Sequence, residues 1–299
     1  MENNNLNFYK QSTNAPIINW ILSIIISSII IFFFSYYYSL IITYLPLVYL
    51  NILLVLLFGY SIFLIGNSIN RLFKIRNRKR ALVSIIILSF LGFYFQWINY
   101  FYIISHEEIT LFIKDWDLLS LIFLSPKAML DYIIEINKNG AWEMFSFPIK
   151  GIILWGIWFL ELLLIVLMAY FSYIKSKIDP FSDENNNWYV KNTIDVDFEQ
   201  ILLKKNFIDE FKEDAFKAIS SLKQGYGTRY SKIYIYTSKG SKSLISIENI
   251  IVTNQGRGNK EHTTIIEPCY IKNSLLNEIK DKYKLRKPEF FDFIKEIYA

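Results

Sequence analysis

Residues 151–174 read GIILWGIWFLELLLIVLMAYFSYI, and this apolar stretch carries one charged side chain, Glu161, near its middle. An α-helix needs about 20 predominantly apolar residues in a row to cross a bilayer. Lys175 and Lys177 follow the stretch directly, and the chain beyond them has an ordinary polarity. The stretch therefore predicts a last membrane span that joins a membrane-embedded half to a soluble half.

The residues before this stretch predict three further spans. Residues 11–70 contain no charged side chain. As one helix they would measure about 90 Å, roughly three times the hydrocarbon thickness, so they must fold back. We expect the reversal at Tyr44-Leu45-Pro46, because proline cannot continue a helix but can start one. The predicted spans are about 16–38, 45–65, 81–104 and 151–174, within a membrane domain over 16–177.

Two features of the sequence predict how the chain lies in its membrane. Six basic residues separate the second and third spans: Arg71, Lys74, Arg76, Arg78, Lys79 and Arg80. Such an excess between spans marks a cytoplasmic loop, and its juxtamembrane position favours contact with anionic lipid head groups over nucleic acid. We therefore expect both termini in the cytoplasm of a bacterial cell, with the protein in the cytoplasmic (inner) membrane. Residues 1–15 are polar and rich in asparagine, which predicts a disordered tail.

The outer segment, residues 105–150, is acidic overall and is expected to form a helical cap on the membrane surface. Ser105 and Glu108 have the spacing of a capping box, which predicts a helix from Ser105 to about Asp115. A second helix is expected from Ser125-Pro126 to Asn139-Gly140. The run His106-Glu107-Glu108 also suggests a metal site, but no second histidine lies nearby, so we favour capping.

The soluble part predicts an α+β domain over residues 197–299, after a linker over 178–196. Apolar residues at helical spacing predict a helix over about 208–222. Strand-like runs separated by turn residues predict an antiparallel sheet of three strands, over 230–237, 244–253 and 262–271. Two closing helices are expected over about 274–283 and 288–298.

Glu161 is the most specific candidate site residue. A carboxylate inside a membrane is expensive unless it is protonated, paired or in contact with water. Counting helical rise from the outer ends of the spans places Gln96 and Ser28 at the depth of Glu161. We therefore predict a polar cluster of Glu161 with Gln96 and one of Ser27 or Ser28. Three roles stay open for the carboxylate: holding the bundle together, passing ions or protons, and contacting a helix of a partner.

Other motifs are weaker. Gly225-Tyr226-Gly227 lacks the preceding strand and following helix of a phosphate loop, so we interpret it as a helix end and turn. Arg257 lies in a predicted hairpin loop and is a possible partner contact. His262 and Cys269 are seven residues apart on one predicted strand, which places them on opposite faces. Because Cys269 is the only cysteine, no disulfide within the chain and no multi-cysteine metal site is expected.

Three functions remain open on these observations. From residue 178 onward the chain has 19 basic and 18 acidic residues, a balance that argues against nucleic-acid binding. No motif for a cofactor or metal appears. The leading hypothesis is a non-enzymatic integral membrane subunit that positions the α+β domain for a protein partner or a second copy. The alternatives are a channel or transport component with Glu161 in its path, and a membrane enzyme acting on lipid through His106, Glu107 and Glu108.

Overall fold

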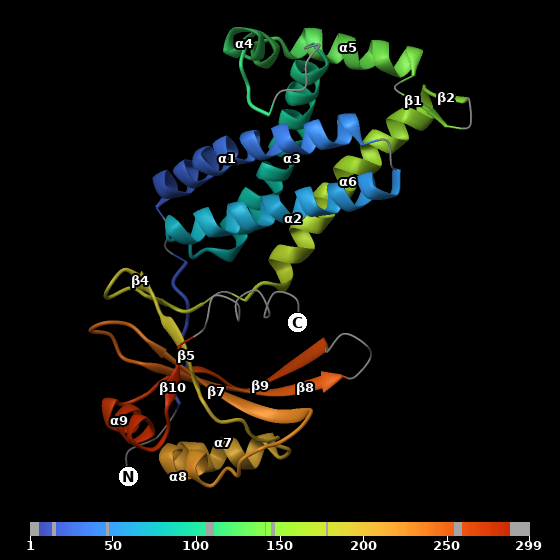
Figure 1. Cartoon of the computed structure of the whole chain (residues 1–299). Coiled ribbons are helices and arrows are strands. Elements are labelled where there is room, and N and C mark those ends of the chain that lie inside the picture. Colours follow the sequence, from blue (N-terminus) through green and yellow to red (C-terminus); the bar gives the residue numbers. More distant parts are fainter. Residues whose placement is uncertain are drawn as a thin grey trace. The chain divides into compact units, whose positions relative to one another are not determined.

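The computed structural model describes residues 6–13, 16–45, 48–105, 111–140, 142–144, 147–177, 179–253 and 259–287 (Figure 1). The chain divides into two compact units. The membrane unit comprises residues 13–176, and the α+β unit comprises residues up to Ser12 together with those from Lys177 onward.

The membrane unit contains four helices that are long and apolar enough to cross a membrane. These are α1 (Ile17–Tyr44), α2 (Val48–Leu72), α3 (Arg78–Ile104) and α6 (Ile152–Lys175). The four predicted spans are confirmed as helices, but α1 continues six residues past the predicted end at residue 38, and α2 continues to Leu72 instead of ending near 65. The physical reason is the absence of any helix breaker before Pro46 and before the turn at residues 73–77.

Glycines allow the helices of this unit to approach closely. A Cβ on Gly59 would lie 2.7 Å from the backbone oxygen of Ile165, so α2 and α6 cross where only a hydrogen separates the two backbones. A Cβ on Gly92 would meet Ile62 at 2.8 Å. Small residues at such crossings are the usual means by which membrane helices gain packing contacts, because lipid provides no hydrophobic driving force between them.

The segment between α3 and α6 holds two short helices and a hairpin. It consists of α4 (Trp116–Leu124), α5 (Pro126–Asn139), β1 (Trp142–Met144) and β2 (Phe147–Ile149), and Figure 1 shows α4 and α5 at the end of α3. The predicted second helix is confirmed, with Pro126 at its start and Gly140 at φ +96° after its end. Ser105 does not start the predicted helix, because it ends α3, its N–H bonding to the oxygen of Phe101 at 3.1 Å. Residues 111–115 are not helical, and residues 106–110 lie outside the described residues.

Asp115 provides the helix start that Ser105 was expected to provide. Its carboxylate accepts a hydrogen bond from the N–H of Leu118 at 2.9 Å and so caps α4. The hairpin of β1 and β2 was not predicted. The proposed metal-binding run at residues 106–108 lies outside the described residues.

The α+β unit is built on an antiparallel sheet in the order β10-β5-β7-β8-β9, with β6 also paired to β7. The long strands are β7 (Arg229–Thr237), β8 (Leu244–Thr253) and β9 (Asn259–Tyr270). The short ones are β5 (Val190–Ile194), β6 (Phe198–Glu199) and β10 (Leu285–Arg286), and a separate pair is formed by β3 (Phe181–Ser182) and β4 (Asn187–Trp188).

The sheet therefore has six strands, and the prediction of three strands is wrong. The predicted linker over 178–196 is also wrong, since β3, β4 and β5 lie there. Its many asparagines form the turn between β3 and β4, where Asn186 has a φ of +49°. β5 then pairs with the edge of β7, from Val190 opposite Thr237 to Thr193 opposite Tyr234. This pairing satisfies backbone groups of β7 that a three-stranded sheet would leave open.

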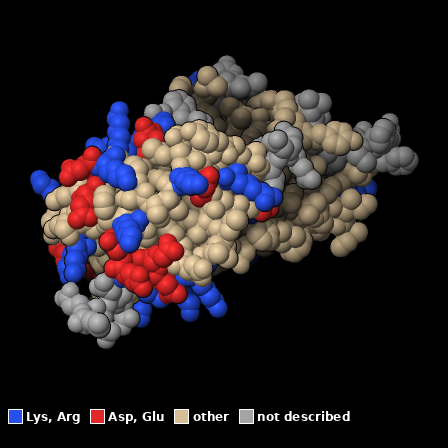
Figure 2. Space-filling view, turned by 90° about the horizontal axis from the view of Figure 1, so that it is seen from below, with Lys and Arg blue, Asp and Glu red and all other residues tan. Residues whose placement is uncertain are grey.

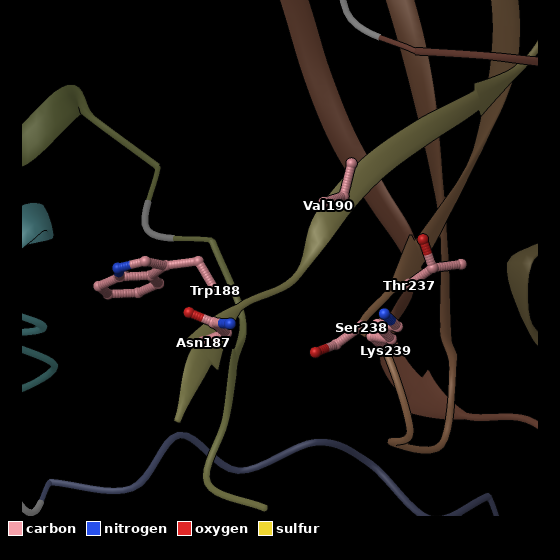
Figure 3. A pocket seen from close by; sticks show the side chains of 6 residues that line it. All are labelled: Asn187, Trp188, Val190, Thr237, Ser238 and Lys239. Carbon is pink, nitrogen blue, oxygen red and sulfur yellow. The ribbon is translucent and has the colours of Figure 1, made fainter. Parts of the chain in front are cut away.

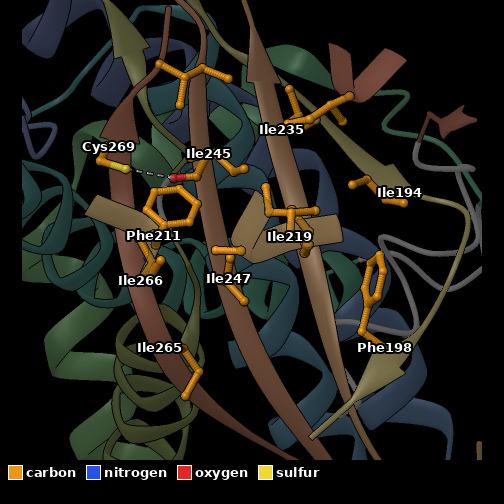
Figure 4. Packing of buried hydrophobic residues seen from close by; sticks show 14 of the residues in the cluster. Ile194, Phe198, Phe211, Ile219, Ile235, Ile245, Ile247, Ile265, Ile266 and Cys269 are labelled. Atoms are coloured by element: carbon orange, nitrogen blue, oxygen red, sulfur yellow. Dashed lines mark hydrogen bonds between the residues drawn. The ribbon is translucent and has the colours of Figure 1, made fainter. Parts of the chain in front are cut away.

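One face of the sheet and three helices enclose the core of this unit. The helices are α7 (Lys204–Glu213), α8 (Ala215–Ser220) and α9 (Asn273–Lys282). Figure 4 shows Ile245, Ile247 and Phe211 among the packed side chains. Cys269 is fully buried there, with its Sγ 3.8 Å from the oxygen of Ile245, and burial raises the pKa of its thiol to about 12. The thiol therefore stays protonated at neutral pH.

The predicted helices of this unit are partly confirmed. The helix expected over 274–283 is α9, and the one expected over 288–298 lies outside the described residues. The helix expected over 208–222 is two helices, because Asp214 leaves the helical conformation and its carboxylate accepts from the N–H of Lys217 to cap α8. Gly225 is not a helix end: its Cβ would lie 2.3 Å from the oxygen of Phe198, so it permits a close approach to β6.

The N-terminal segment belongs to the α+β unit. Residues 6–12 were expected within a disordered tail, but Phe8 forms a β-bridge with Cys269 of β9. The N–H of Tyr9 bonds to the oxygen of Pro268 at 2.8 Å, and the N–H of Tyr270 bonds to the oxygen of Asn7 at 2.9 Å. The edge strand of a sheet has backbone N–H and C=O groups without partners, and an extended segment can pair with them. On β9 this partner is the N-terminal segment.

Candidate functional site

The candidate site within the membrane unit is a carboxylate held by two other helices. Glu161 lies on α6, and its Oε1 accepts a hydrogen bond from the Tyr38 hydroxyl of α1 at 2.7 Å. The same oxygen accepts from Nε2 of Gln96 on α3 at 3.0 Å. Tyr38 and Gln96 are buried, whereas Glu161 is partly exposed. Three of the four long helices thus meet at one polar group.

The surroundings of this cluster hold its side chains in place. The ring of Tyr38 stacks on Phe58 of α2, with 4.4 Å between the ring centroids. Gln96 Oε1 is buried, and it has no hydrogen-bond partner in the part of the chain that the structure describes. An unpaired acceptor in an apolar medium is unfavourable. The oxygen of Gln96 is therefore the atom of the cluster that can still accept a hydrogen bond. A protonated Glu161 could supply the missing donor after the amide rotates.

The predicted partners of Glu161 are correct for Gln96 and wrong for the serines. The Ser28 hydroxyl donates to the oxygen of Ile24 in its own helix at 2.7 Å, and Ser27 is buried without a contact to Glu161. Depth was counted from an outer end near residue 38, but α1 ends at Tyr44. This difference of six residues accounts for part of the error, because Tyr38, which occupies the position, lies ten residues beyond Ser28.

The serines of α1 serve the packing of α1 against α3. The Asn99 side chain donates to Ser35 Oγ at 2.8 Å, and the Ser39 hydroxyl donates to the oxygen of Gln96 at 2.9 Å. Nearer the other end of both helices, Nε1 of Trp20 donates to Ser84 Oγ at 2.7 Å. Residue 20 of α1 thus meets residue 84 of α3, and residues 35–39 meet residues 96–99, so α1 and α3 run in parallel.

The six predicted basic residues lie at the end of α2, in the following turn and at the start of α3. Asn77 caps α3, its side chain accepting from the N–H groups of Lys79 and Arg80 at 3.0 and 3.1 Å. Arg78 bonds through Nη2 to the oxygen of Ile174 at 3.1 Å, near the C-terminus of α6. A guanidinium at that position satisfies a carbonyl that the helix leaves free. The backbone oxygen of Arg80 also accepts from Nε1 of Trp20 at 3.1 Å. The remaining three are Arg71, at the end of α2, and Lys74 and Arg76, in the turn. Arg257, the other predicted contact residue, lies outside the described residues.

A polar network on β8 was missed by the sequence analysis. Lys177 bonds to both carboxylate oxygens of Glu248, at 3.0 and 2.9 Å, and Nδ1 of His262 lies 3.1 Å from Oε2. Burial alone would raise the pKa of Glu248, but the hydrogen bonds from His262 and Lys177 and the charge of Lys191 lower it to about 2. A lone carboxylate in the apolar run Leu244–Thr253 was the signal that could have revealed it.

His262 and Cys269 lie on opposite faces of the sheet, as predicted. His262 faces Glu248, and Cys269 belongs to the core. Among the described residues, no group of three or more histidine, cysteine, aspartate or glutamate side chains is placed to hold a metal ion. Figure 2 shows lysine, arginine and acidic side chains interspersed over the charged part of the face in view.

Two shallow hollows lie beside the turn between β7 and β8, residues 238–243. The first, of about 390 Å³, is lined by Asn187, Trp188, Val190, Thr237, Ser238 and Lys239. In Figure 3 the turn residues group together, and the indole of Trp188 extends away from them. The second, of about 400 Å³, lies between the turn and α9.

These features define a multi-pass membrane protein with a folded antiparallel α+β domain. Comparison with known protein families, curated proteins and solved structures found no match.

Proposed function

We propose that the protein is a non-enzymatic integral membrane subunit that holds its α+β domain for a protein partner at the cytoplasmic face of a bacterial inner membrane. The observation that carries the proposal is the pairing of the N-terminal segment with β9. It gives the α+β unit two attachments to the membrane unit, one preceding α1 and one following α6.

The pairing supports an even number of membrane crossings. Residues 6–12 and the strands of the sheet form one compact unit, so both must lie on the same side of the membrane. Four crossings by α1, α2, α3 and α6 meet this condition. The basic residues between α2 and α3 support assigning that side to the cytoplasm, with these residues toward anionic lipid head groups.

Side-chain contacts hold the two chain segments that flank the membrane unit within the α+β unit. The Tyr9 hydroxyl donates to the oxygen of Phe181 at 2.9 Å and accepts from its N–H at 2.8 Å. Its ring packs edge-on against Tyr189 and Tyr270. At the second attachment, Lys177 follows the end of α6 by two residues and pairs with Glu248. Because these two segments are already ordered within the α+β unit, ordering them does not add to the cost of partner binding.

The cluster at Glu161 supports the same interpretation. Each interhelical hydrogen bond within a membrane contributes about 0.6 kcal/mol on average, so the two bonds to Glu161 stabilise the arrangement of α1, α3 and α6. We assign Glu161 the role of joining these helices.

Chemical crosslinking in cells followed by native mass analysis of the protein extracted in mild detergent tests the proposal. We expect a foreign protein at fixed stoichiometry. Tyr9→Ala should lower its recovery, because the variant loses the contacts to Phe181 and to two tyrosines. Asn7→Ala is the matched control, since Asn7 contributes its backbone oxygen to the pairing. A monomer without any crosslinked protein would refute the proposal.

A channel or transport role is the second candidate, and the partial exposure of Glu161 favours it. It requires Glu161→Gln to abolish ion or proton flux in liposomes while the protein stays folded. Tyr38→Phe is the matched control, because it removes one hydrogen bond and leaves the carboxylate. Equal flux in wild type and Glu161→Gln would eliminate this candidate.

A further inference from the structure

The hollow between the β7–β8 turn and α9 has the lining of an anion site. The residues around it are Thr237, Ser238, Gly240, Ser241, Lys242, Ser243, Asn273, Leu276 and Lys280. Two are cationic, most are polar, and none is a carboxylate. Leu276 is the only large apolar member, so an apolar ligand would find little surface to bury.

The lining includes two lysines. Lys242 comes from the turn and Lys280 from α9, and both are exposed. Neither forms an ion pair with any residue that the structure describes. Two like charges beside one hollow raise the electrostatic potential in it and attract a negatively charged group.

Ser243 adds a hydroxyl to the lining. The residue is only 4% exposed, and its backbone oxygen accepts from the N–H of Ile271 at 2.9 Å. Because Ser243 lines the hollow, its hydroxyl is a donor for a ligand oxygen.

The turn is held in place before any ligand binds. Gly240 has a φ of +82°, a conformation that glycine adopts without strain. The Asn185 side-chain amide donates to Ser241 Oγ at 2.6 Å and also to the oxygen of Lys239, while the N–H of Ser241 bonds to the oxygen of Ser238 at 3.2 Å. A turn fixed in this way loses little entropy on binding.

We propose that this hollow binds a phosphate group, held by the ammonium groups of Lys242 and Lys280 and by the Ser243 hydroxyl. Charge-assisted hydrogen bonds from ammonium groups to phosphate oxygens are the strong interactions that such a lining can offer. The phosphate belongs either to a soluble compound or to a phospholipid head group, since both present the same oxygens to the hollow.

Calorimetric titration of inorganic phosphate into the full chain, in nanodiscs of phosphatidylcholine, tests the proposal. We expect saturable binding that weakens about tenfold in Lys242→Gln and in Lys280→Gln, the loss expected for one charge-assisted hydrogen bond. Ser243→Ala should also weaken it. Lys205→Gln is the matched control, because Lys205 is an exposed lysine of α7 away from the hollow. Its affinity should equal that of the wild type.

Titration of dioctanoyl phosphatidic acid distinguishes the two sources. If it binds more tightly than inorganic phosphate, and both lysine variants weaken it, the ligand is a lipid head group. Equal or weaker binding with the same dependence on the lysines assigns a soluble phosphate compound. Absence of saturable binding up to about 10 mM of both probes, or binding that neither lysine variant weakens, would overturn the proposal.

Discussion

Glu248→Gln is expected to destabilise the α+β unit in a manner that depends on pH. The substitution keeps the volume of the side chain and removes its charge. Lys177 and His262 then lose the carboxylate that both contact, at 2.9 to 3.1 Å. Because the Glu248 side chain is only 12% exposed, the loss occurs where water compensates poorly.

The magnitude follows from the pKa of Glu248. A decrease from 4.5 to about 2 on folding corresponds to about 3 kcal/mol of stability at neutral pH. Lys177 is 59% exposed, so screening by water reduces this value, and we expect a loss of about 1 to 3 kcal/mol. The folded pKa is the lower one. The contribution is therefore complete above pH 4.5 and is lost as the pH falls toward 2.

Hydrogen exchange of β8 and β9 peptides in increasing urea measures this stability in the full chain in detergent. Wild type and Glu248→Gln should differ at pH 7 and converge as the pH is lowered from 4.5. Lys212→Gln serves as the control, because it breaks an exposed ion pair with Asp209 that contributes little. Equal urea midpoints for wild type and Glu248→Gln at pH 7 would refute the assigned role of the carboxylate.

Two further predictions concern the membrane unit. Gly59→Ala should lower the thermal stability in detergent by about 1 to 3 kcal/mol, because its Cβ would meet a backbone oxygen of α6. Gly156→Ala, with nothing within 4 Å of the new Cβ, should have little effect, and similar losses in both variants would contradict the packing. Tyr38→Phe should cost about 0.5 to 1.5 kcal/mol through its lost hydrogen bond to Glu161, measured in the same assay. Ser28→Ala, which loses a bond within its own helix, should cost less, and the reverse order would contradict the cluster.

Long, strongly patterned segments were predictable from the sequence, and short or non-local ones were not. The four spans follow from apolar length alone, and counting helical rise brought Gln96 to the level of Glu161. The position of Tyr38 depended on where α1 ends, and the uncharged sequence up to residue 44 does not mark that point. Strands of two to five residues such as β5, β6 and β10 have too few positions to show an alternation. They form because β7 and β5 offer an edge.

The pairing of the N-terminal segment with β9 could not be predicted from the sequence, for a different reason. It joins residues that are more than 250 positions apart, and neither Tyr9 nor its neighbours have a pattern that predicts a strand. Only the folded sheet, with Pro268 and Tyr270 at its edge, provides the groups with which the segment pairs.

Labelling of single introduced cysteines with a membrane-impermeant maleimide tests the central claim most directly. Native Cys269 is buried with its pKa raised to about 12, so it should not react in the folded protein. The account predicts that Lys127→Cys is labelled in intact spheroplasts, whereas Lys10→Cys, Lys79→Cys and Lys205→Cys are labelled only after lysis. Labelling of Lys10→Cys and Lys205→Cys from opposite sides of the membrane would contradict four crossings and an α+β domain attached at both ends.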